Sequence, residues 1–105
     1  MVESILKSTA IPAQPGRYPD PPTCTYAIWF DAVSADGPDC CNRIFTHDAM
    51  IELYEPQQDP AAEAALEAEL NRRGIKWTKQ PRYWLQSVRR YQVIYEFSHI
   101  EKRRT

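Results

Sequence analysis

The sequence predicts an α+β domain in which one central helix packs on a mainly antiparallel sheet, in the order α-β-β-α-β-β-β. One observation behind this is a segment, residues 59–74, that carries signals for both ends of a helix. Another is a series of short segments in which apolar and polar residues alternate, as is typical of strands. A chain of 105 residues is long enough for one core, so we expect a single domain over residues 1–105.

The central helix is the most clearly marked element. Asp59 is a suitable N-cap, because its carboxylate can accept hydrogen bonds from unpaired backbone N–H groups, and Pro60 suits the first helical position. Gly74 should end the helix in a left-handed conformation, with Ile75 folding back onto Leu70. One side carries a narrow apolar stripe of Ala62, Ala65, Leu66 and Leu70. That stripe needs a sheet to pack on.

The helical glutamates Glu63, Glu67 and Glu69 are expected on the solvated side of the helix. Glu69 and Arg73 are four residues apart, the spacing of an ion pair on a helix surface. We therefore expect these carboxylates to be solvated and to carry no chemistry.

Alternation predicts strands at residues 26–33, 44–55, 75–78, 82–87 and 91–100. The first two are joined by a loop at 34–43 and should pair antiparallel, while the last two should form a hairpin around 87–90. Within the second strand, one face carries His47, Ala49, Ile51 and Leu53. Within the last strand, one face carries Tyr91, Val93, Tyr95 and Phe97. The helix stripe should pack on such an aromatic-rich face.

The N-terminal part is expected to be less regular. Residues 2–8 suit a short amphipathic helix that is too brief to persist unless it docks. Residues 11–22 hold five of the nine prolines and should form an extended arm. This arm is either a rigid connector or a segment that embraces a neighbouring subunit, since Pro-rich segments serve as both.

Catalytic, metal and cofactor signals are not apparent. Cys24, Cys40 and Cys41 have no metal-binding or redox spacing, so we interpret them as reduced thiols. Neighbouring side chains on a strand point to opposite faces, so His47 and Asp48 cannot readily cooperate, and His99 stands alone. The three glycines are too far apart for a phosphate-binding loop. We therefore expect no enzyme activity, no catalytic residue, no metal and no cofactor.

The sequence also gives no sign of a membrane segment or of a signal peptide, so the cytoplasm is the expected compartment. The net charge of −1 hides a strong polarity. Residues 1–71 hold three basic and twelve acidic side chains, whereas residues 72–105 hold ten basic and two acidic ones. If these regions form opposite flanks, copies can dock head to tail, and such contacts can close into a ring.

Nucleic-acid binding is the alternative. The basic last third interleaves aromatic with basic residues, a pattern that offers stacking and phosphate contacts. The residues concerned are Trp77, Tyr83, Trp84, Tyr91 and Tyr95 with Lys76, Lys79, Arg82, Arg89 and Arg90. Against this, a packed sheet contains such aromatics anyway, and the acidic region repels phosphates. We therefore expect nucleic acid not to be a partner.

Two stretches carry a family resemblance. Residues 46–56, Thr-His-Asp-Ala-Met-Ile-Glu-Leu-Tyr-Glu-Pro, precede an Ala/Glu helix, and residues 90–97, Arg-Tyr-Gln-Val-Ile-Tyr-Glu-Phe, come before Ile100-Glu101-Lys102. With Pro21-Pro22 ahead of Tyr26, this succession resembles small phage and prophage neck proteins, the nearest group being tail terminator (tail completion or tail-to-head joining) proteins. The resemblance covers about residues 11–102 and contains no catalytic signature.

The resemblance implies a structural virion protein, made in the host cytoplasm, with an α+β fold that assembles into a ring, commonly a hexamer. Its partners would be tail tube and head-completion proteins, with no small-molecule substrate and no membrane. The chain is short for the group, so another neck connector, such as a head-completion protein, stays open. Our candidate interface residues are Arg17, Tyr18, Asp36, Asp39, Arg43, Arg72, Arg82, Arg89, Lys102 and Arg103.

Overall fold

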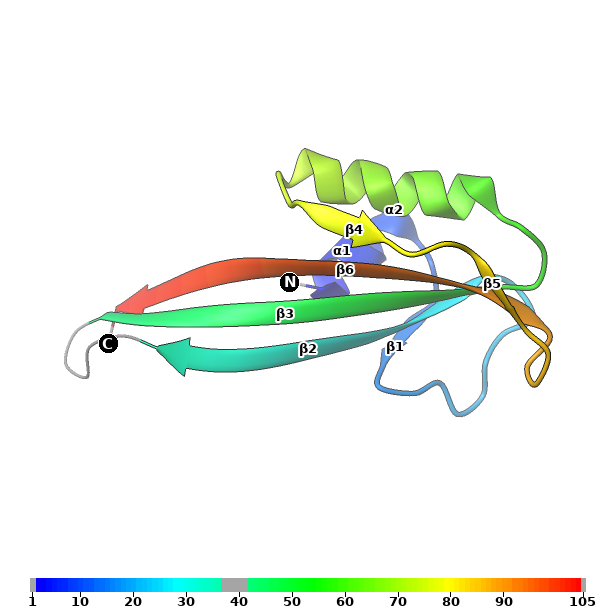
Figure 1. The fold of residues 1–105 in the computed structure, drawn as a ribbon, viewed down its shortest axis with the longest axis horizontal. Coiled ribbons are helices and arrows are strands. Elements are labelled where there is room, and N and C mark those ends of the chain that lie inside the picture. The colour runs from blue at the N-terminus through cyan, green and yellow to red at the C-terminus, as the bar shows by residue number, and fades with distance from the viewer. Residues whose placement is uncertain (1, 37–41, 105) are drawn as a thin grey trace.

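The computed structural model describes residues 2–36 and 42–104, and it describes side-chain burial within residues 2–34 and 45–99. Its elements are six strands and two helices (Figure 1). In chain order they are α1 (Val2–Thr9), β1 (Ala13–Pro15), β2 (Tyr26–Asp36), β3 (Asn42–Glu55), α2 (Pro60–Arg72), β4 (Trp77–Lys79), β5 (Tyr83–Leu85) and β6 (Arg90–Arg104).

All six strands belong to one sheet with the order β1-β2-β3-β6-β4, and β5 also pairs with β6. Pairing is antiparallel throughout, except that β1 runs parallel to β2. The predicted antiparallel pairing of residues 26–33 with residues 44–55 is confirmed, because β2 pairs with β3. The predicted hairpin of residues 82–87 and 91–100 is also confirmed, because β5 pairs with β6. β2, β3 and β6 are much longer than the other strands and form the spine of the molecule (Figure 1).

The predicted fold class is wrong. The protein is mostly β, it has two helices and not one central helix, and its element order is α-β-β-β-α-β-β-β. The additional strand, β1, lies inside the Pro-rich arm, where Pro12 accepts a backbone hydrogen bond from Ala27 although a proline cannot donate one. A parallel edge strand of this length leaves no alternation in the sequence, which is why the arm had no strand signal.

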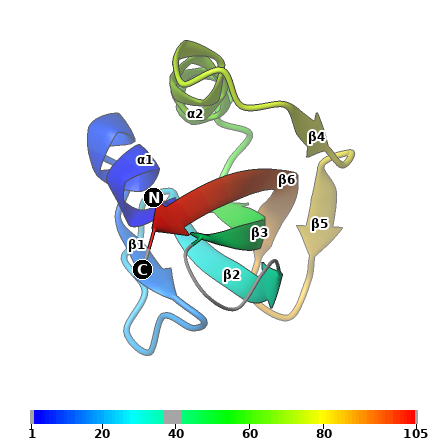
Figure 2. The same cartoon turned by 90° about the vertical axis from the view of Figure 1, so that its left-hand side faces the viewer.

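The first helix persists because it docks. Val2, Ile5 and Leu6 of α1 are buried against the same cluster of residues as Leu66 and Leu70 of α2. Both helices lie on the same side of the sheet (Figure 2). The buried face of the sheet is therefore covered by α1 as well as by α2.

The ends of α2 are as predicted. Asp59 caps the first turn by accepting a hydrogen bond from the Ala62 backbone at 3.1 Å, and its other carboxylate oxygen accepts one from the Thr25 hydroxyl at 2.6 Å. At the far end Gly74 has φ 71°, and the Ile75 backbone donates to the Leu70 carbonyl at 3.0 Å. The bond from Ile75 to Leu70 belongs to the Schellman motif, which a left-handed glycine permits. A side chain at this position would be strained.

The core lies between the helices and one face of the sheet. From the helices it takes Ile5, Leu6, Leu66 and Leu70, and from the sheet Ala27, Ile51, Leu53, Val93, Tyr95 and Phe97. The face predicted for β3 and β6 is therefore confirmed as the one on which the helix stripe packs. Neither helix is long and apolar enough to cross a membrane, within the residues described.

Candidate functional site

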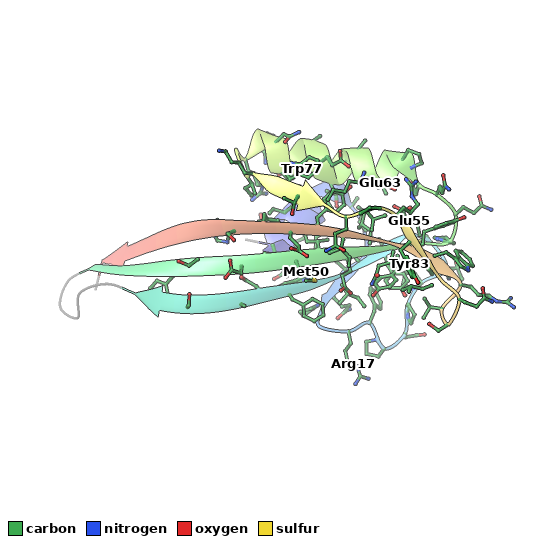
Figure 3. All side chains as sticks on the ribbon, viewed as in Figure 1. Arg17, Met50, Glu55, Glu63, Trp77 and Tyr83 are labelled. Atoms are coloured by element: carbon green, nitrogen blue, oxygen red, sulfur yellow. The ribbon has the colours of Figure 1, made fainter. Side chains whose placement is uncertain are left out.

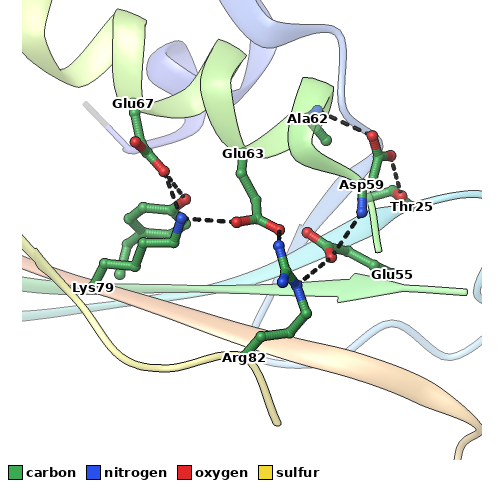
Figure 4. Close-up of polar contacts among 9 residues, drawn as sticks. Thr25, Glu55, Asp59, Ala62, Glu63, Glu67, Lys79 and Arg82 are labelled. Atoms are coloured by element: carbon green, nitrogen blue, oxygen red, sulfur yellow. Dashed lines mark hydrogen bonds and ion pairs between the residues drawn. The ribbon is translucent and has the colours of Figure 1, made fainter. Parts of the chain in front are cut away.

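A cluster of charged side chains joins α2 to the chain between β4 and β5 (Figure 4). Glu63, in the first turn of α2, contacts Lys79 through one carboxylate oxygen at 2.7 Å and Arg82 through the other at 2.6 Å. Lys79 also contacts Glu67 at 2.8 Å, and the Tyr95 hydroxyl donates to Glu67 at 2.6 Å. The expectation that these glutamates are all solvated is therefore wrong for Glu63, which is 3% exposed.

Glu55, the last residue of β3, lies beneath this cluster and is fully buried. Burial raises the pKa of its carboxyl to about 7, and hydrogen bonding to the Glu63 carboxyl beside it adds to the rise. Burial also acts to raise the pKa of Glu63, but hydrogen bonds from Lys79 and Arg82 outweigh it and lower that pKa below its usual value. The two carboxyls therefore differ in protonation because Glu63 has two cationic partners, at 2.6 and 2.7 Å, whereas the contact of Arg82 with Glu55 is longer, at 3.5 Å.

The contacts of this cluster hold elements together. Glu55 accepts a hydrogen bond from the Asp59 backbone at 3.2 Å, and Arg82 reaches Glu55 at 3.5 Å while binding Glu63. Figure 4 shows Glu55 and Glu63 pointing toward each other between the helix and the sheet. We assign the cluster a structural role: it fastens the first half of α2 to the sheet.

A second polar cluster lies farther along the long strands. His47 of β3 stacks on His99 of β6 with 4.3 Å between ring centroids, and its Nδ1 lies 3.0 Å from the Asp31 carboxylate of β2. Asp48, on the other face, accepts a hydrogen bond from Ser98. The interpretation that His47 and Asp48 do not cooperate is confirmed, and the carboxylate beside His47 comes instead from the neighbouring strand. In the part of the chain described, no group of three or more His, Cys, Asp or Glu side chains is arranged to hold a metal ion.

The sheet face opposite the helices is open. Cross-strand register places Phe30, Met50 and Glu96 in one row of this face, and Ile28, Glu52 and Ile94 in the next. Phe30 is 43% exposed, while the other apolar members are half-buried. A shallow hollow of about 720 Å³ crosses this face; its lining includes Phe30, Ala32, Asp48, Met50, Lys76, Thr78 and Glu96. The face thus mixes apolar with charged residues, and the charged ones include Asp48 and Glu52 on its middle strand, β3.

The far halves of β2, β3 and β6 form a three-stranded ribbon that projects beyond both helices (Figure 1). β1 covers the outer edge of β2 only at residues 27–29, and β4 covers the outer edge of β6 only at residues 95–97. From Phe30 to Asp36 and from Ser98 to Arg104, both outer edges therefore lack a partner strand in the described chain. Unpaired edges of this kind are templates for pairing with another chain.

The structure gathers part of the predicted interface set. Asp36 lies opposite Ile44, which lies opposite Lys102, and Arg43 lies opposite Arg103, so these four candidates meet at the end of the ribbon. Their backbone positions are described, whereas Asp39 lies outside the described residues, as do Cys40 and Cys41 of the predicted loop. That loop is also shorter than predicted, because β2 continues to Asp36 and β3 begins at Asn42.

The other predicted candidates are dispersed. Arg72 and Arg82 are held by glutamates of α2, at 2.6 Å each, and are not free for a partner. Arg17 is exposed on the segment after β1 (Figure 3), and Tyr18 packs edge-on against Tyr26 with ring centroids 5.3 Å apart. Arg89 is exposed at the turn before β6, where its φ is 53°. These five do not form one surface with the end of the ribbon.

Charge pairing within the molecule also changes the polarity argument. Four of the basic residues after position 71 contact glutamates of α2, namely Arg72, Arg73, Lys79 and Arg82. Because α2 lies against β4 and the following segment, much of the acidic and basic charge separated along the sequence meets in the fold. The predicted pair of Glu69 with Arg73 is confirmed at 2.7 Å.

Two features missed from the sequence had a signal. Glu55 follows Ile51 and Leu53 at the strand period of two, which places it on the buried face. Glu63 precedes Leu66 and Leu70 by three and seven residues, the spacing of one helix face. Periodicity therefore marked both carboxylates as buried, although their residue type suggested solvent.

Comparison of the chain with models of protein families gave no match, and a search of curated proteins found none with significant similarity.

Proposed function

We propose that this protein is a structural subunit of the head-tail neck of a phage or prophage, where copies form a ring as a tail terminator or tail completion protein. The resemblance of residues 46–56 and 90–102 to such proteins gives the setting. In a phage neck, the protein would assemble in the host cytoplasm and remain in the virion. It would contact tail tube and head-completion proteins, and it would need neither substrate nor cofactor.

The observation that carries the proposal is the projecting ribbon. Although His47 is buried, large apolar side chains of the ribbon are exposed: Val33 is 54% exposed and Phe30 43%, and neither described helix covers this part of the sheet (Figure 1). A narrow antiparallel ribbon with no core of its own is only marginally stable in isolation. Contact with other chains along the ribbon and across the open sheet face would supply the missing burial, which favours an assembly protein over an enzyme.

The oligomeric state tests the proposal directly. Sedimentation velocity over a wide concentration range should show one closed species of several subunits, and negative-stain micrographs should show rings. Co-expression with the tail tube protein of the same phage or prophage should give tubes capped at one end by this protein. A monomer at high concentration that also leaves tube ends bare would overturn the proposal.

Nucleic-acid binding is the weaker candidate, because Lys79 and Arg82 of the basic, aromatic segment already contact Glu63. Exposed positive charge remains at Lys76 and Arg89 on the described surface. Fluorescence anisotropy of labelled single- and double-stranded DNA over a salt series tests for DNA binding, since binding through phosphates must weaken steeply as the salt concentration rises. Tight, salt-dependent binding by a monomer would replace the neck proposal.

A further inference from the structure

The two open edges of the ribbon are complementary in charge. Along the free part of β2 the only charged residues are Asp31 and Asp36. Along the free part of β6, Lys102, Arg103 and Arg104 outnumber Glu101. Pairing β2 with a second β2, or β6 with a second β6, would bring like charges together, which is unfavourable across strands. Pairing β2 with β6 of another copy brings opposite charges together.

The edge of β2 already accepts a parallel strand within the subunit. β1 pairs with it in parallel at residues 27–29, and the Gly16 backbone donates to the Trp29 carbonyl at 2.9 Å. At Gly16 the chain leaves this edge, with φ 74°, beside a surface hollow of about 510 Å³ lined by Pro15, Gly16, Trp29, Phe30, Asp31 and Ala32. A second parallel strand could therefore continue along β2 from the point where β1 stops.

The strand directions fit the same arrangement. β2 and β6 are each antiparallel to β3, so they are parallel to each other. In a ring whose axis runs along the strands, every copy keeps the same strand direction. β6 of one copy then meets β2 of the next in parallel, which is the orientation that β1 uses.

We infer that, within the ring proposed above and depending on it, residues 98–104 of β6 in one copy pair in parallel with residues 30–36 of β2 in the next copy. The sheet then continues from subunit to subunit, and both free edges disappear. Asp36, Ile44 and Lys102 lie in one row of the sheet, so they are at the same height along the strands. The rotation that relates one copy to the next runs about an axis along the strands and keeps this height. It therefore brings Asp36 of one copy beside the basic end of β6 in its neighbour.

Cysteine cross-linking tests this contact. On a background with Cys24→Ser, Cys40→Ser and Cys41→Ser, we would combine Ser34→Cys with Ile100→Cys, because these positions share a row of the sheet. Versions with Ser98→Cys or Lys102→Cys in place of Ile100→Cys allow for a shift of the partner strand. Within one copy the paired positions flank β3 at about 10 Å, which is beyond the reach of a disulfide, so a bond must join two copies.

Oxidation of the double variants should give a ladder of covalent oligomers that ends at the size of the ring. Each single variant alone should remain uncross-linked, and a mixture of the two singles should give dimers only. A ring that forms without cross-links in any double variant would overturn this inference and leave the proposed function standing. Cross-linking by single variants would indicate a two-fold contact and also overturn it, whereas a monomer would overturn both proposals.

Charge reversal provides a second measurement on the same contact. Asp36→Lys should weaken self-association at least tenfold, and adding Lys102→Asp should restore most of it. Glu3→Lys, at an exposed position of α1 away from this contact, makes the same change of charge as Asp36→Lys; it is the matched control and should leave association unchanged. Equal association by the Asp36→Lys variant and the natural protein would contradict the charge complementarity.

Discussion

At the scale of single residues, Glu55 shows how burial changes the chemistry of a carboxyl group. It has no solvent exposure, and its neighbours include the Glu63 carboxyl. Two buried carboxylates side by side would repel, and the nearby cations bind Glu63 more closely than Glu55. The proton therefore stays on Glu55 up to about neutral pH, where its pKa is raised to about 7.

This makes stability depend on pH in a defined direction. Because the folded pKa of Glu55 lies above its unfolded value, its contribution to stability is complete at low pH and is lost as pH rises through about 7. Glu55→Gln keeps an uncharged group there at every pH. We therefore expect the free energy of unfolding of this variant to be about 2 kcal/mol higher than that of the natural protein at pH 8. At pH 4, below the usual carboxyl pKa of the unfolded chain, the two should be nearly equal.

Urea unfolding at both pH values measures this difference. Glu3→Gln, which removes an exposed carboxylate from α1, is the control and should show no such dependence on pH. A Glu55→Gln variant that is less stable than the natural protein at pH 8 would show that the charge of Glu55 supports the fold.

At the scale of elements, α2 is held by its apolar stripe and also by one arginine and one lysine from outside the helix. Arg82 comes from the segment between β4 and β5 and meets the buried Glu63, whereas Arg72 pairs with Glu69 on the helix surface. A surface pair adds little to stability, but removing one partner of a buried pair leaves an uncompensated charge.

The two arginines therefore form a matched test. Arg82→Met should lower the free energy of unfolding by about 1–3 kcal/mol, because Glu63 and Glu55 lose their shared cation in a buried place. Arg72→Met should have little effect, since Glu69 keeps Arg73. Chemical denaturation of both variants at pH 7 measures the contrast, and equal losses would mean that Glu63 is solvated in solution.

At the scale of the whole molecule, the sheet has one face buried by two helices and one face left open. Phe97 and Phe30 illustrate the contrast, since Phe97 is 5% exposed in the core and Phe30 is 43% exposed on the open face. The same kind of side chain therefore supports folding on one face and is available for contact on the other.

Replacing these two phenylalanines by alanine should separate stability from assembly. Phe97→Ala should lower the free energy of unfolding by about 3–5 kcal/mol, as is usual for a buried phenylalanine. Phe30→Ala should change it by less than about 1 kcal/mol and should instead weaken self-association. Thermal unfolding at low protein concentration, followed by sedimentation at high concentration, distinguishes these effects. A large stability loss in dilute Phe30→Ala would indicate that the open face is covered within the monomer.

Local signals determined several parts of this protein. Asp59 and Gly74 fixed both ends of α2, because capping depends on side chains and backbone conformations within a few residues. The alternation in β3 and β6 identified the buried face, because residues two apart on a strand share a side.

Only the tertiary structure decided the rest, because it depends on contacts between distant segments. α1 persists through docking of Ile5 and Leu6, and β1 exists because the edge of β2 offers it partners. The charge polarity read from the sequence is cancelled in part where Lys79 and Arg82 meet α2. In the same way, residue order could not show that β2 and β6 would end as the two open edges of one ribbon, since strand order in a sheet is set by long-range pairing.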